Sequence, residues 1–105
     1  MNTYKLVGKV PVKCDMWNIM PDADRVISRD VFGQVTVSTV FLQIDHSFLN
    51  EGPVLFETMI FGGEWDEYQE RYQTYDEAVE GHKRACDMVN KVSIDRDNKL
   101  NDLGL

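Results

Sequence analysis

Two histidines and a few polar side chains are the residues of this 105-residue chain best suited to chemistry. His82 follows Gly81 in a stretch whose apolar residues recur every three or four positions, which predicts one helical face. His82 either is a core residue bonded to the backbone or faces a cavity, where it could bind a ligand and titrate near neutral pH. A glycine inside a helix costs about 1 kcal/mol relative to alanine, so Gly81 favours a close approach by another segment or a ligand.

Asp45 and His46 stand next to each other at the end of an apolar run. Adjacent strand residues point to opposite faces, so these two cannot share one metal ion without a bend between them. The chain contains neither HxxxH nor HxH spacing, and its two cysteines form no CxxC pair. We therefore predict no metal and no cofactor. Asp45 is explained equally well as a side chain that bonds loop amides.

Glu57, Thr58 and Arg71 are polar residues on two runs predicted to pair as a hairpin. One register places Glu57 opposite Arg71, and such a cross-strand ion pair contributes about 0.2–1 kcal/mol. The alternative is that Arg71 holds a ligand's anionic group while Glu57 orients it. Trp65 lies in the intervening loop after two glycines. It either folds back on the sheet or stacks on a planar base.

Catalysis by a nucleophile is poorly supported, because no serine lies in a GxSxG elbow. We predict a non-catalytic protein, with a small hydrolase as the weakest alternative. The candidate ligand-binding residues are Asp45, His46, Glu57, Thr58, Trp65, Arg71 and His82.

The elements that must position these residues are several strands followed by one helix. The predicted strands cover residues 4–12, 25–31, 35–45, 54–61 and 67–73, and the helix begins at Thr74. Thr74 and Glu77 have the spacing of a capping box. The expected fold is α+β, with an antiparallel four- to five-stranded meander sheet covered on one face by a single C-terminal helix. Residues 1–92 form one domain, and residues 93–105 are a polar, aperiodic segment that we expect to be a mobile tail.

The chain carries a net charge of −7 and has a pI near 4.6. An acidic surface repels phosphate backbones, so direct nucleic-acid binding is not expected, although such a surface would suit a partner with a basic groove. No apolar run approaches the roughly 18 residues needed to cross a bilayer. Two unpaired cysteines and the lack of a leader pattern predict a cytoplasmic protein.

Several short segments of the sequence resemble those of one protein family. They are residues 36–42 (with VSTVF inside residues 37–41), Asp45-His46, Phe48, residues 53–63 (with LFETM and FGG), Arg71-Tyr72, Thr74, Glu77-Ala78 and Gly81-His82. Together they resemble a family of short, mostly uncharacterised proteins of tailed bacteriophages and prophages. The resemblance covers residues 35–89, about half of the chain. It implies a phage accessory protein that acts in the host bacterial cytoplasm, and it brings no enzymology with it.

From these observations we expect a phage protein that counters host defence by binding and sequestering a small, nucleotide-type ligand. An enclosed pocket is hard to build in a chain of this length, so a homo-oligomer with a site between subunits is consistent with the expectation. The main alternative is an acidic inhibitor that binds a host protein, acting as a nucleic-acid mimic. A membrane role is not expected.

Overall fold

The computed structural model of the protein describes residues 2–15, 20–45, 47 and 52–102, with the backbone alone described past Lys91. In chain order its elements are β1 (Thr3–Val7), β2 (Val10–Cys14), α1 (Asp22–Arg25), β3 (Val26–Phe32), β4 (Val35–Phe41), β5 (Phe56–Phe61), β6 (Gln69–Tyr72) and α2 (Tyr75–Asp102).

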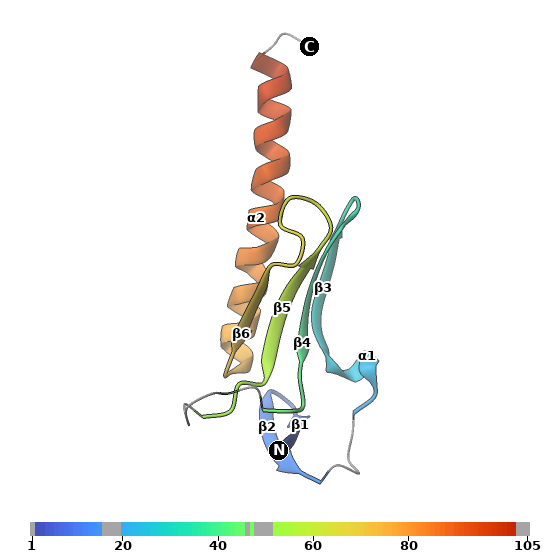
Figure 1. Ribbon diagram of the computed structural model, residues 1–105, viewed down its shortest axis with the longest axis vertical. Helices are drawn as coiled ribbons and strands as arrows, with labels where there is room; N and C mark the ends of the chain where they lie inside the picture. Colours follow the sequence, from blue (N-terminus) through green and yellow to red (C-terminus); the bar gives the residue numbers. More distant parts are fainter. Residues whose placement is uncertain (1, 16–19, 46, 48–51, 103–105) are drawn as a thin grey trace.

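Strands β3 to β6 form one antiparallel sheet in sequence order, and α2 packs across one of its faces (Figure 1). The α+β class and the antiparallel meander under a C-terminal helix are thereby confirmed. Each strand pairs with its neighbour in the chain. The short turn at Gly33 returns β3 directly onto β4, whereas β4 and β5 pair across the longer connection of residues 42–55. A separate β-hairpin, β1–β2, lies beyond the end of the sheet from which α2 starts (Figure 1).

The first predicted strand, residues 4–12, is wrong as a single element. The chain turns at Gly8, whose φ of 63° lies in the left-handed region that glycine adopts without strain. Val7 then pairs with Val10, so the apolar alternation continues through a hairpin instead of along one strand. Alternation alone cannot detect such a turn, because both arms keep the same period. The hairpin contacts the sheet region through Tyr4, whose amide donates to the Gln43 carbonyl at 2.7 Å.

Strand β4 lies inside the sheet between β3 and β5, as its apolar sequence predicted. It is fully buried on one face only, at Val37, Thr39 and Phe41, and half-buried on the other. Residues 35–45 are apolar at positions that alternate to both faces, which predicts a strand buried on both sides. That prediction is wrong, since a single helix can cover only one face. The strand also ends at Phe41 instead of residue 45, and Gln43 takes a left-handed φ of 66° that breaks the extended chain.

Helix α2 buries one stripe against the sheet at Ala78, His82, Ala85 and Val89. Two apolar clusters lie beneath it. One contains Phe41, Leu55, Phe56, Tyr72 and Ala78, and the other contains Val37, Ile60, Ala85 and Val89. Full burial of each large apolar side chain contributes about 1.5–3 kcal/mol. On α2, His82 lies between Ala78 of the first cluster and Ala85 of the second, so its polar side chain separates the two apolar clusters.

The start of α2 is fixed at Thr74. The Thr74 hydroxyl accepts a hydrogen bond from the Glu77 amide at 3.1 Å and donates to the Glu77 carboxylate at 2.9 Å. The Thr74 cap is confirmed.

The helix continues to Asp102 and extends beyond the sheet (Figure 1), whereas the sequence pattern predicted an aperiodic segment from residue 93. Residues 93–102 contain no proline or glycine to stop a helix. Within the described residues, no helix has the length and apolar character needed to span a membrane.

Candidate functional site

His82 is the centre of a hydrogen-bonded group between α2 and the sheet. Its side chain is 6% exposed, and its ring nitrogen Nδ1 lies 2.7 Å from the Thr39 hydroxyl on β4. The helical period predicted that the His82 side chain points toward the sheet, and its contact with Thr39 on β4 confirms that direction. A buried imidazole needs partners for both nitrogens, and Thr39 supplies one of them.

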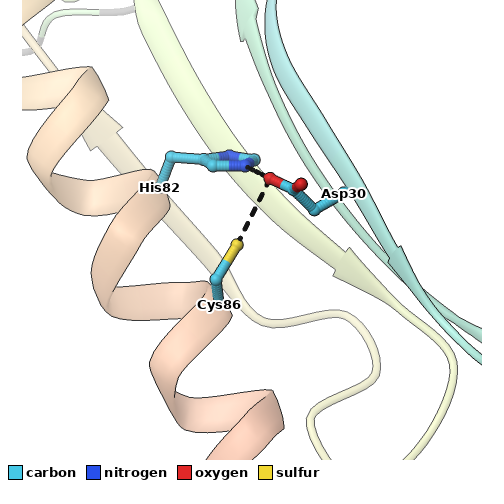
Figure 2. Close-up of side chains that lie close together, drawn as sticks. All are labelled: Asp30, His82 and Cys86. Atoms are coloured by element: carbon cyan, nitrogen blue, oxygen red, sulfur yellow. Dashed lines mark hydrogen bonds and ion pairs between the residues drawn. The ribbon is translucent and has the colours of Figure 1, made fainter.

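Asp30 supplies the other partner. Its Oδ2 lies 2.7 Å from His82 Nε2 and 3.6 Å from Cys86 Sγ, so the His82 ring and the Cys86 thiol both point at one carboxylate oxygen (Figure 2). Asp30 reaches this position because it pairs with Val37 on β4, which places both side chains on the helix face of the sheet. The hydrogen bond from His82 lowers the pKa of the Asp30 carboxyl, which is therefore ionised at neutral pH.

Two buried threonines, Thr39 and Thr58, extend the hydrogen-bonded group from His82 into the core. Thr39 and Thr58 lie opposite each other on β4 and β5, and their hydroxyl oxygens are 2.5 Å apart. Both residues are fully buried. Burial raises the pKa of the Tyr72 phenol, and the nearby Thr58 hydroxyl opposes that rise in part. The polar groups thus run from the surface at Asp30 to the centre of the sheet.

A hollow of about 390 Å³ lies between β3 and α2 at the surface end of this network. Its walls include Asp30, Phe32, Tyr75, His82, Lys83 and Cys86. The Asp30 side chain is 51% exposed, so its carboxylate is open to the hollow while one oxygen is held by His82. The hollow therefore combines the fixed Asp30 carboxylate, a second acidic residue (Asp87), one lysine and two aromatic rings.

Asp30, His82 and Thr39 have the acid–histidine–hydroxyl order of a hydrolase triad, but the hydroxyl cannot act as a nucleophile. Thr39 has no exposed surface, so a substrate carbonyl cannot reach its oxygen. Cys86 borders the hollow, but burial and the neighbouring Asp30 raise the pKa of its thiol to about 11. A thiol with that pKa is almost wholly protonated at neutral pH and is a weak nucleophile. This geometry favours binding over nucleophilic catalysis.

Glu57 and Arg71 face each other across β5 and β6, in one of the registers that the sequence allowed. Arg71 Nε lies 2.8 Å from Glu57 Oε2, and the Gln69 amide also donates to that oxygen. Glu57 neighbours Thr58 in the strand, so its side chain lies on the sheet face opposite α2. As polar residues within an apolar framework, Glu57 and Arg71 were expected to lie near the sheet-and-helix interface, and that expectation is wrong for both.

The remaining candidates also lie away from His82 or outside the described residues. Asp45 Oδ1 accepts the amides of Ser47 and Val54 at 2.8 and 2.9 Å, which fits its interpretation as a loop-bonding residue. Trp65 is 39% exposed in the loop between β5 and β6 and does not line the hollow. His46 lies outside the described residues. Of the seven candidates, Thr58 and His82 belong to one network.

Asp30, Thr39 and Cys86 were not singled out from the sequence. Cys86 falls one helical turn after His82, a spacing that places the two side chains on the same helix face. Asp30 alternates with Ser28 and Phe32, so it shares a strand face with them. Neither pattern reveals that the two faces meet, because that depends on how α2 crosses β3.

Comparison of the chain with protein-family models, with curated proteins and with solved structures gave no match.

Proposed function

We propose that the protein is a non-catalytic binding domain that holds a small, nucleotide-type ligand in the hollow between β3 and α2. The proposal depends on the environment of the Asp30 side chain. Its ionised carboxylate is fixed by buried His82 and open to a hollow with aromatic walls. A side chain held in one orientation loses less entropy when a ligand binds, and this favours recognition.

The residues that line the hollow could contact the base and the phosphate of a nucleotide. An ionised carboxylate is an acceptor only, so Asp30 would take the N–H groups on the edge of a base. Phe32 and Tyr75 line the hollow and offer ring faces, and base–aromatic stacking contributes about 1–3 kcal/mol per base. Lys83, whose ammonium also lies 3.5 Å from the exposed Glu80 carboxylate, would supply a positive charge for a phosphate. The volume of about 390 Å³ lies at the small end of the range for ligand pockets, which suits one nucleotide.

The biological role that we propose follows from the resemblance to phage proteins. A protein that binds a nucleotide without converting it would lower the free concentration of a host immune signal in the infected cell. In this role the protein is a phage accessory factor acting in the bacterial cytoplasm. A homo-oligomer would serve the role equally well if a second subunit closed the open side of the hollow.

The test is a calorimetric and thermal-shift screen of chelator-treated protein against a panel of linear and cyclic nucleotides. A ligand present at 100 times its Kd should stabilise the fold by about 2.7 kcal/mol. Asp30→Asn should weaken binding at least tenfold, because the amide presents an N–H group where the ligand needs an acceptor. Asp24→Asn is the matched control, since Asp24 is exposed on α1 and loses the same charge.

Two results would overturn the proposal. One is a panel in which no nucleotide raises the melting temperature or gives heat on titration. The other is a ligand whose affinity falls equally in Asp30→Asn and Asp24→Asn, because binding would then follow net charge and not the hollow.

A further inference from the structure

We propose that Asp30, His82 and Cys86 form a binding site for a transition-metal dication, with Zn²⁺ as the ion that best fits the donor atoms. The site adds a second ligand class to the hollow between β3 and α2. It does not rest on nucleotide binding, because its three donors come from the protein alone.

The distances between the donor atoms support the site. One ligand atom from each residue lies within 4.8 Å of the other two. Bonds of about 2.0 Å to nitrogen and oxygen and about 2.3 Å to sulfur, in tetrahedral geometry, require donor atoms about 3.3–3.6 Å apart. Cys86 Sγ and Asp30 Oδ2 are already 3.6 Å apart. His82 Nε2 and Asp30 Oδ2 are 2.7 Å apart and must separate by about 0.6 Å. Asp30 can make this movement because its side chain is half exposed.

The types of donor select the ion. An imidazole nitrogen, a thiolate sulfur and a carboxylate oxygen together suit a borderline-soft ion such as Zn²⁺, whereas Mg²⁺ and Ca²⁺ prefer oxygen alone. Three protein donors leave one tetrahedral position free. That position would face the hollow, because all three residues line its wall.

A metal-binding histidine needs a hydrogen-bond partner for its second ring nitrogen, and His82 has one. With the metal on Nε2, the ring must carry its proton on Nδ1 and donate it, and the Thr39 oxygen lies 2.7 Å away to accept it. Without the metal, Nε2 donates to Asp30 and Nδ1 accepts from Thr39. Each hydroxyl of the Thr39–Thr58 pair can donate or accept, so the pair can serve both tautomers. Metal binding then moves the ring proton from Nε2 to Nδ1, and the Cys86 thiol proton leaves to solvent.

The site can be tested with Zn²⁺ and Co²⁺ alone, added to chelator-treated full-length protein without any nucleotide. We expect one ion per chain by calorimetry, with a micromolar or tighter dissociation constant. Co²⁺ should give a thiolate-to-cobalt charge-transfer band in the near ultraviolet together with the visible bands of a tetrahedral ion. Cys86→Ser should abolish the charge-transfer band, and Asp30→Asn should weaken Zn²⁺ binding at least tenfold.

Cys14→Ser is the matched control, because Cys14 is the other free cysteine and lies on β2, away from the cluster. It should leave the band and the affinity unchanged. Cys86 and Asp30 are partly exposed, so their variants should keep the fold, which circular dichroism would verify. The site is refuted if Zn²⁺ does not bind, or if binding survives unchanged in Cys86→Ser and Asp30→Asn. Because no nucleotide is present, either outcome is independent of the nucleotide screen.

Discussion

Gly81 on α2 lies directly against the phenol ring of Tyr72 on β6. A methyl group placed on Gly81 would overlap the Tyr72 hydroxyl oxygen and the adjacent ring carbons. The glycine in the helix interior is therefore explained by a close approach of another segment, one of the two causes expected from the sequence. This contact also sets how near α2 lies to the sheet beside His82.

Gly81→Ala should destabilise the protein, although alanine is the better helix former. Helix propensity would add about 1 kcal/mol of stability. Overpacking against a buried ring costs about 1–3 kcal/mol, so the net change should be unfavourable. Urea unfolding would measure it, with Glu80→Ala on the exposed face as the control. In a Tyr72→Leu background, Gly81→Ala should cost less. An equal cost in both backgrounds would show that the ring is not the cause.

Thr39→Val should leave His82 Nδ1 buried without its partner. The shape of the side chain is nearly kept, so the loss is mainly that of the hydrogen bonds to His82 and Thr58. An unsatisfied buried polar group costs about 1–3 kcal/mol. Thr36→Val is the control, because Thr36 lies on the same strand but on the outer, half-buried face. Equal unfolding free energies for the two variants would contradict the role given to the Thr39 hydroxyl.

The Glu57–Arg71 pair should respond asymmetrically to mutation. The Glu57 side chain is 10% exposed and that of Arg71 is 37% exposed. Arg71→Met leaves a nearly buried carboxylate with the Gln69 amide as its remaining described partner, and should cost about 1–3 kcal/mol. Glu57→Gln keeps an acceptor for Arg71 and should cost less, as measured by denaturant unfolding. Neither variant should change metal or nucleotide binding, because the pair lies on the face opposite α2.

Tyr68 should give the protein an alkaline limit to its stability. Its hydroxyl donates to Glu70 Oε2 at 2.6 Å. Burial, and then the hydrogen bond to Glu70, raise the pKa of Tyr68 from 10.0 to about 12. A group whose pKa is higher in the folded state contributes stability that is complete below its unfolded pKa. This contribution should be present below pH 10 and fall as the pH rises toward 12. Urea unfolding across that range, compared with Tyr68→Phe, would measure it. A constant difference between the two proteins would contradict the prediction.

The sequence predicted the fold class and the direction of His82 because both depend on local periodicity. The steps of three and four around His82 define the buried stripe of α2 wherever that helix packs. The Glu57–Arg71 pairing was one of several registers that the sequence allowed, because the connection over residues 62–68 does not fix a single register; the structure shows that this register is the one formed. The hairpin at Gly8 was missed because a glycine can either continue a strand or turn it, and the neighbouring residues do not decide between the two.

The sequence by itself determined that a histidine on α2 would point toward the sheet beside a glycine, and that the sheet would be an antiparallel meander. Only the tertiary structure decided which residues meet that histidine. Asp30, Thr39 and Cys86 come together because β3 and β4 align in one register and α2 crosses above them. Long-range packing fixes that crossing, and the Tyr72 ring against Gly81 is one of its contacts. Periodicity tells which way a side chain points, but not what lies there.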